Sequence, residues 1–207
     1  MTDSKDQQKS WPVIKITDSW QIFKIMAEFV KGFETLSSIG PGISLFGSAR
    51  SKPGDPYYEM AEILGEKLAL KGYAVITGGG PGIMEAGNKG AKKAKGSSVG
   101  VSIDLPFETK ANDYVDHDKH IHFDYFFVRK VMLVKYAQAF VVFPGGLGTM
   151  DELFEALTLI QTRKIKKFPI VLMGKNYWKG LLDWMKETML HKEHFINEHD
   201  LFLFEIC

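Results

Sequence analysis

The sequence has few of the features that mark secreted, membrane or nucleic-acid-binding proteins. It holds one cysteine, Cys207, so no intrachain disulfide can form, and a cytoplasmic location is expected. No apolar run approaches the ~20 residues of a membrane span, and the polar N-terminus lacks the apolar core of a signal peptide. The formal net charge is only +1, which gives no sign of a polycation that binds nucleic acid. We therefore expect neither a membrane nor a nucleic acid among its partners.

The bulk composition is that of an ordinary globular domain. The chain has 207 residues, of which 45% are hydrophobic and 25% are charged. This length is sufficient for one domain with a substantial core. We expect residues 1–16 to form a flexible polar arm and residues 17–207 to form a single domain.

Short apolar segments alternate with segments of helical periodicity along most of the chain. Strands are expected at 43–47, early in 73–80, and at 98–103, 139–143 and 168–173, with a short one at 119–123. Helices are expected at 18–38, 55–71, 82–95, 124–136, 150–161 and 177–190. This alternation predicts an α/β fold with a doubly wound parallel sheet covered by helices on both faces. The result is a Rossmann-like three-layer sandwich to which the N-terminal helix is an addition.

Three glycine-bearing loops are predicted to share one edge of this sheet. With strand order 3-2-1-4-5, ligands bind at the carboxyl ends of the strands where the order reverses. Loops 46–50 and 143–149 meet there, and loop 77–82 lies beside them. A dinucleotide fingerprint requires a glycine at its sixth position, where these glycine loops have Ile83 and Asp151, and no P-loop is present. No NAD cofactor is expected.

The glycines of the third loop, Gly145, Gly146 and Gly148, have two interpretations. They could allow a phosphate to approach free N–H groups at a helix N-terminus, with Thr149 adding a hydroxyl. Alternatively, they only permit positive φ in a tight turn. The turn is the better interpretation of one such loop, but three loops on one edge favour the phosphate site.

Arg129 and Glu152 also allow a structural and a functional interpretation. Arg129 stands in an almost wholly apolar helical segment, so it either snorkels to the surface or lies beside an anion. Glu152 completes a Thr-x-x-Glu pattern that starts at Thr149, which fits a capping box. On local evidence alone the cap is the better interpretation, and a catalytic carboxylate is the alternative.

The motifs together resemble a known family. Residues 144–152 fit PGGxGTxxE, an Arg–Lys pair precedes them at 129–130, and residues 78–84 form a loop similar to GGGxxGxM. This combination resembles the Lonely Guy family of cytokinin riboside 5′-monophosphate phosphoribohydrolases, which are often labelled lysine decarboxylases. The resemblance covers roughly residues 40–190. No pyridoxal-phosphate lysine motif supports the decarboxylase label.

The resemblance implies a hydrolase that cleaves the N-glycosidic bond of adenine-type nucleoside 5′-monophosphates to free base and ribose 5-phosphate. It implies Arg129 and Glu152 as the catalytic pair. The substrate-binding residues that it implies are Gly79, Gly80, Glu108, Lys130, Gly145, Gly146, Leu147, Gly148, Thr149, Met150, Asp151 and Thr158. It implies a homodimer and requires neither a metal nor a cofactor. The alternative is a non-catalytic protein of the same fold that binds a nucleotide or phosphate ligand or carries a cofactor.

Overall fold

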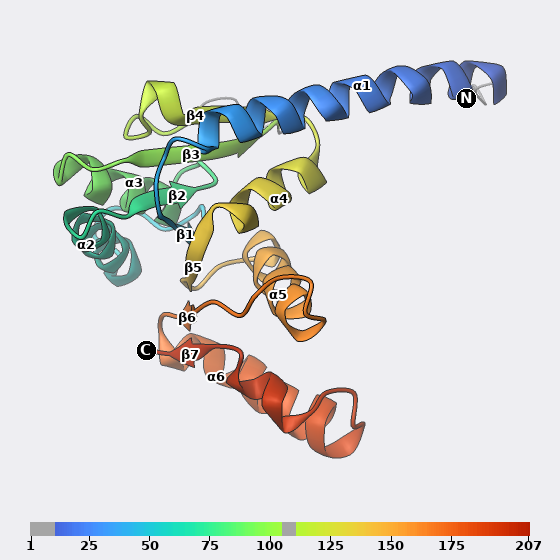
Figure 1. The fold of residues 1–207 in the computed structure, drawn as a ribbon. Coiled ribbons are helices and arrows are strands. Elements are labelled where there is room, and N and C mark those ends of the chain that lie inside the picture. The colour runs from blue at the N-terminus through green and yellow to red at the C-terminus, as the bar shows by residue number, and fades with distance from the viewer. Residues whose placement is uncertain (1–10, 105–110) are drawn as a thin grey trace, which may run out of the picture.

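The computed structural model describes residues 11–104 and 111–207, with side chains from residue 19 onward (Figure 1). Its centre is a seven-stranded parallel sheet with the order β4-β3-β2-β1-β5-β6-β7. The strands are β1 (Gly42–Phe46), β2 (Ala74–Thr77), β3 (Ser98–Ile103), β4 (His120–Phe123), β5 (Ala137–Val142), β6 (Ile170–Leu172) and β7 (Glu205–Ile206). The predicted doubly wound fold is confirmed. The predicted order of five strands is the central part of the sheet, and β4 and β7 extend its two edges.

Helices cover both faces of the sheet (Figure 1). They are α1 (Trp11–Leu36), α2 (Pro56–Leu70), α3 (Ile83–Lys93), α4 (Phe126–Lys135), α5 (Leu147–Gln161) and α6 (Lys175–Trp184). A π-helical segment, Met185–Lys192, continues α6, and short 3₁₀ turns occupy His117–Lys119 and Glu198–Phe202. One core lies between the sheet and α2 and α3, and a larger one lies under α1, α4 and α5. Each face of the sheet is therefore covered by packed apolar side chains.

The helices α2 and α3 approach closely because glycines line their contact. A Cβ at Gly90 would lie 2.0 Å from the carbonyl oxygen of Glu62, and one at Gly65 would lie 2.3 Å from that of Gly87. These distances exclude any side chain without movement of the backbone. The close packing holds α3, which follows the second glycine loop, against α2.

The N-terminal helix α1 lies along one side of the sheet (Figure 1). It presents apolar side chains to solvent. Trp20, Phe23 and Val30 are each more than 60% exposed. Residues 11–16, part of the predicted polar arm, form the start of this helix. No helix in the described residues combines the length and the apolar character that crossing a membrane would require. The homodimer and the cytoplasmic location stay predictions.

Candidate active site

Three loops meet at the carboxyl edge of the sheet, where strand order reverses between β1 and β5. The backbone N–H of Ser48 donates to the carbonyl of Pro144 (2.9 Å), and that of Ile83 donates to the carbonyl of Ser48 (3.0 Å). The loops enclose a cavity of about 630 Å³. The described residues that line it are Phe46, Gly47, Ser48, Ala49, Arg50, Gly78, Met84, Phe126, Arg129, Gly146, Leu147, Gly148, Thr149, Asp151 and Glu152. The cavity thus lies where the doubly wound fold predicts a ligand.

The glycines of the third loop serve different purposes. A Cβ at Gly145 would lie 2.1 Å from Thr149 Oγ1 and 3.0 Å from the backbone of Gly47, so packing requires a glycine there. A Cβ at Gly146 or Gly148 would meet nothing within 4 Å. None of the three has a positive φ. The positive-φ interpretation therefore fails, and the backbone at Gly146 and Gly148 is open to a ligand.

Helix α5 begins earlier than predicted, and this removes the capping box. Gly146 is the N-cap residue, without a side-chain hydrogen bond, and Leu147 is the first helical residue. Thr149 therefore stands inside the first turn, and its own N–H donates to the carbonyl of Gly146 (3.0 Å). Because Thr149 is not the cap, the capping-box role of Glu152 is wrong.

Glu152 points into a site that leaves part of its carboxylate unsatisfied. The residue is 5% exposed, and its Oε2 is buried without a hydrogen-bond partner in the described part of the chain. Burial raises the pKa of this carboxyl to about 7, although the positive charges of Arg129 and Lys130 act to lower it. The negative charges of Glu155 and Asp151 contribute to the rise. An acid with a pKa near 7 can hold or release a proton at physiological pH, as general acid–base chemistry requires.

Arg129 is held beside the cavity and does not snorkel away from it. It lies in the first turns of α4, and its Nε donates to the carbonyl of Val101 in β3 (2.9 Å). A Cβ at Gly78 would lie 2.6 Å from Arg129 Nη2. The missing side chain at Gly78 therefore makes room for the guanidinium group. This arrangement places a cation and the buried acid of Glu152 in the wall of one cavity.

Lys130 faces α5 and not the cavity. Its Nζ lies 2.9 Å from Asp151 Oδ2 and 2.7 Å from Glu155 Oε2, and its side chain is only 16% exposed. Burial alone would lower the pKa of Lys130, but the contacts with Glu155 and Asp151 raise it above its ordinary value. Lys130 is therefore a charged contact between the two helices that carry Arg129 and Glu152.

The second glycine loop is fixed by buried polar groups. Gly79 has a φ of +75°, and its N–H donates to Thr77 Oγ1 (2.9 Å). The side-chain amide of Asn112 donates to the carbonyls of Gly79 (3.1 Å) and Gly80 (3.0 Å). These two glycines do not line the cavity, whereas Gly78 does. Their place in the structure is to hold the loop that brings Gly78 to Arg129.

The other residues that the resemblance implies are spread over several environments. Leu147 lines the cavity and is 89% exposed. Met150 packs against the apolar core. Thr158 is exposed near the end of α5, away from this cavity, and its hydroxyl donates to the carbonyl of Phe154 (2.7 Å). Glu108 lies outside the described residues. The binding roles of all four stay predictions.

The structure adds Arg50 and Ser48 to the candidate residues. Both belong to the loop after β1 and line the cavity, and the N–H of Arg50 donates to Ser48 Oγ (3.1 Å). The predicted strand order places this loop at the crevice, but no sequence motif singles out either side chain. Their position directly after the first strand of a doubly wound sheet was the available signal.

One group of side chains outside the cavity has the spacing of metal ligands. Ligand atoms of Asp104, His122 and Asp124 lie within 4.8 Å of one another at the ends of β3 and β4. Asp104 and Asp124 are exposed, and His122 Nε2 lies 3.9 Å from Asp104 Oδ1. The group has no member in the cavity lined by Arg129 and Glu152.

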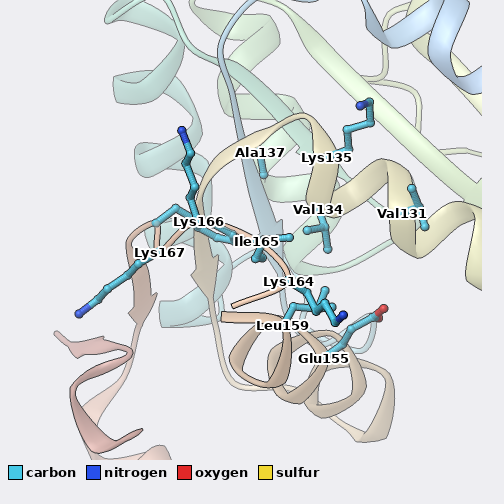
Figure 2. A pocket seen from close by; sticks show the side chains of 11 residues that line it. Val131, Val134, Lys135, Ala137, Glu155, Leu159, Lys164, Ile165, Lys166 and Lys167 are labelled. Atoms are coloured by element: carbon cyan, nitrogen blue, oxygen red, sulfur yellow. The ribbon is translucent and has the colours of Figure 1, made fainter. Parts of the chain in front are cut away.

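A second cavity of about 630 Å³ lies between α4, α5 and residues 164–168 (Figure 2). Figure 2 shows the amino groups of Lys166 and Lys167 pointing away from it. The described residues that line it are Val131, Val134, Lys135, Ala137, Glu155, Leu159, Lys164, Ile165, Lys166, Lys167 and Phe168. This described lining contains no glycine backbone open to an anion. The candidate active site is therefore the cavity at the switch point.

The fold and the first cavity define a class of protein: a doubly wound α/β protein with a ligand cleft at its switch point. The cleft combines open glycine backbone, an arginine and a buried acid. A sequence profile of the family described as "Possible lysine decarboxylase" matches residues 84–207, and the chain belongs to this family.

Named relatives agree with this membership. The chain is 34% identical over 131 residues to the cytokinin riboside 5′-monophosphate phosphoribohydrolase of Mycobacterium tuberculosis, which covers 61% of this chain and 68% of that protein. It is 30% identical over 130 residues to the protein of the same name from Mycobacterium marinum, covering 62% and 69%. The resemblance found in the sequence motifs is confirmed.

Solved structures extend the comparison. The molybdenum cofactor binding protein from Rippkaea orientalis superposes with a TM-score of 0.54 at 28% identity, covering 69% of this chain and 83% of that chain. The molybdenum cofactor carrier protein from Chlamydomonas reinhardtii superposes with a TM-score of 0.59 over 81% and 89%. At 24% identity the second likeness concerns the fold alone.

Proposed function

We propose that the protein hydrolyses the N-glycosidic bond of adenine-type nucleoside 5′-monophosphates, giving free base and ribose 5-phosphate. The observation that carries this proposal is the buried carboxylate of Glu152, whose Oε2 has no hydrogen-bond partner among the described residues. It stands in one cavity with Arg129 and with the open backbone of Gly146 and Gly148. The phosphoribohydrolase relatives support the same reaction.

The amino end of α5 is suited to the 5′-phosphate. The backbone at Gly146 and Gly148 leaves room for an anion, and the positive end of the helix dipole faces it. Thr149, and Arg50 from the loop after β1, line the same cavity. We therefore assign the phosphate to this end of the cavity and the ribose to the space between it and Glu152.

The chemistry follows from charge. Cleavage of a glycosidic bond passes through an oxocarbenium-like sugar, which a nearby carboxylate stabilises. In its ionised form Glu152 also orients a water molecule and accepts its proton as the water oxygen bonds to the anomeric carbon. The bond from that carbon to the base nitrogen breaks, and the base nitrogen takes up a proton from solvent, while Glu152 later returns the water proton to solvent. Arg129 is placed to steady the departing base or the phosphate.

A non-catalytic carrier of a phosphate-bearing ligand is the second candidate. The likeness to the Rippkaea orientalis molybdenum cofactor binding protein favours it, because that protein shares 28% identity and the fold. The acid of Glu152 is evidence against it, since a carboxylate close to an anionic ligand lowers affinity through like-charge repulsion.

The deciding experiment compares the wild type with Glu152→Gln. We expect the wild type to release adenine from AMP, or the modified base from isopentenyladenosine monophosphate, together with ribose 5-phosphate. Chromatography separates and measures these products. The glutamine keeps the size of the side chain and removes its charge, so kcat should fall about 10²–10⁴-fold. Equal turnover by this variant would remove Glu152 from the mechanism. Tight nucleotide binding without base release by the wild type would support the carrier.

Glu85→Gln is the matched control. Glu85 also stands in the first turn of a helix that follows a glycine loop, but it accepts a hydrogen bond from Tyr58 (2.7 Å) and does not line the cavity. The amide oxygen of glutamine can accept the same hydrogen bond. Turnover by this variant should stay close to that of the wild type.

A further inference from the structure

Lys130 joins the two helices of the proposed site through its charge. It follows Arg129 on α4, and its Nζ is within 3 Å of carboxylate oxygens of Asp151 and Glu155 on α5. These two acids stand one residue before and three residues after Glu152, so all three share one end of α5. The single ammonium group therefore lies between the two acids that flank Glu152.

The charges around Glu152 come from three elements of the described structure. Helix α4 supplies Arg129 and Lys130, helix α5 supplies Asp151 and Glu155, and the loop after β1 supplies Arg50 across the cavity. Without Lys130, the two flanking carboxylates would lose the cation that contacts them both. Because the Lys130 side chain is only 16% exposed, water screens this effect weakly.

We propose that Lys130 is a positioning residue, which holds α5 against α4 and offsets the charge of Asp151 and Glu155, so that Glu152 can ionise near neutral pH. This inference rests on the proposed function for its effect on turnover. It departs from the substrate-binding role that the family resemblance implies, because Lys130 does not line the cavity and both its close contacts are carboxylates of α5.

The sign of the effect is fixed by electrostatics. A cation near a carboxyl group lowers its pKa, and a neighbouring anion raises it. Lys130 and Glu155 act on Glu152 in these opposite directions. Removing the lysine should therefore raise the pH at which Glu152 ionises, and removing the Glu155 charge should lower it.

The test is the pH profile of kcat/KM for AMP in Lys130→Met, Lys130→Arg and Glu155→Gln. The acid limb is the part of the profile in which kcat/KM falls as the pH is lowered. Its midpoint should move to higher pH by about one unit in Lys130→Met and to lower pH in Glu155→Gln. Lys130→Arg keeps the charge and should keep the limb near its wild-type position. Opposite movements in two variants that break the same ion pair cannot come from loss of the contact alone.

Two outcomes would overturn the proposal. A plain helix contact predicts lower kcat at every pH with an unmoved limb, and a substrate contact predicts a raised KM with an unmoved limb. Should Lys130→Met fail to fold, Glu155→Gln still decides, because an unmoved or raised limb in that variant contradicts the charge argument.

A readout without turnover separates this proposal from the proposed function. The stability difference between each protein and its Glu152→Gln derivative changes with pH over the range in which Glu152 ionises. In the Lys130→Met background this pH range should extend to higher pH by the same amount as the acid limb of kcat/KM moves in that variant. If the wild type releases no base, the hydrolase proposal fails, and this comparison still supports or overturns the role of Lys130.

Discussion

Glu152→Gln should make the folded protein more stable at alkaline pH. The carboxyl is 5% exposed, and its burial raises its pKa from 4.5 to about 7. In the unfolded chain Glu152 releases its proton near pH 4.5, and in the folded protein it does so near pH 7. Between these values the folded state keeps a proton that the unfolded state has lost. The wild type therefore loses stability as the pH rises through this window.

The size of the effect follows from the two pKa values. One pKa unit corresponds to about 1.4 kcal/mol, so the rise at Glu152 corresponds to about 3 kcal/mol at pH 8. Because the side chain is almost fully buried, no large allowance for solvent screening is needed. For a domain of this length, about 3 kcal/mol corresponds to roughly 6–12 °C in Tm. The glutamine side chain of the variant is uncharged at every pH, so the variant lacks this dependence.

The assay is urea denaturation of both proteins at one protein concentration, from pH 4.5 to pH 8. The two proteins differ at one titratable group, so the pH dependence of the difference in unfolding free energy reports on Glu152. It should be smallest at pH 4.5 and grow in favour of the variant by about 3 kcal/mol up to pH 8. A difference that stays constant over this range would refute the burial argument. A difference that grows in favour of the wild type with rising pH would show that partners stabilise the ionised form of Glu152. That result would contradict the statement that burial destabilises this form.

Three further substitutions test other parts of the cavity. Gly148→Ala adds a methyl group that meets no atom within 4 Å, so stability should rise by up to about 1 kcal/mol while AMP affinity falls, as measured by calorimetry. Arg50→Ala removes an exposed cation from the phosphate end, so KM should rise about tenfold in steady-state kinetics. Gly78→Ala puts a methyl group 2.6 Å from Arg129 Nη2, so kcat should fall more than KM changes, in steady-state kinetics.

Most of the fold could be predicted from the sequence because its central strands are short and apolar. Strand β7 was missed since it has two exposed residues and forms only through its pairing with β6. The start of α5 was placed three residues late, at 150, because Gly148 breaks the pattern of good helix formers in its first turn. Helix N-termini made of glycine are hard to predict, since the ligand or loop that stabilises them is not local.

The candidate site was less predictable because its side chains meet only in the tertiary structure. The motif grouped Gly145 with Gly146, but packing requires the first and leaves the second open. Lys130 stands beside Arg129 in the sequence yet turns to another helix, a direction that spacing on α4 could not give. The contacts that separate these roles join residues far apart in the chain, so an ungapped motif cannot record them.

The position of Glu152 favours catalysis over storage of a ligand. Its carboxyl group caps no helix, and its Oε2 accepts no hydrogen bond within the described residues, so its burial costs stability with no structural return. In a carrier, the same charge would also repel the phosphate that the open glycines accommodate. Arg129 and Lys130 offset this cost only in part, because burial still raises the pKa of the carboxyl. A reaction that builds positive charge on the sugar gives the acid a further favourable partner, and that charge exists only in the transition state. A buried acid that is costly both in the empty protein and beside a bound anion therefore supports the proposed hydrolysis over the carrier alternative.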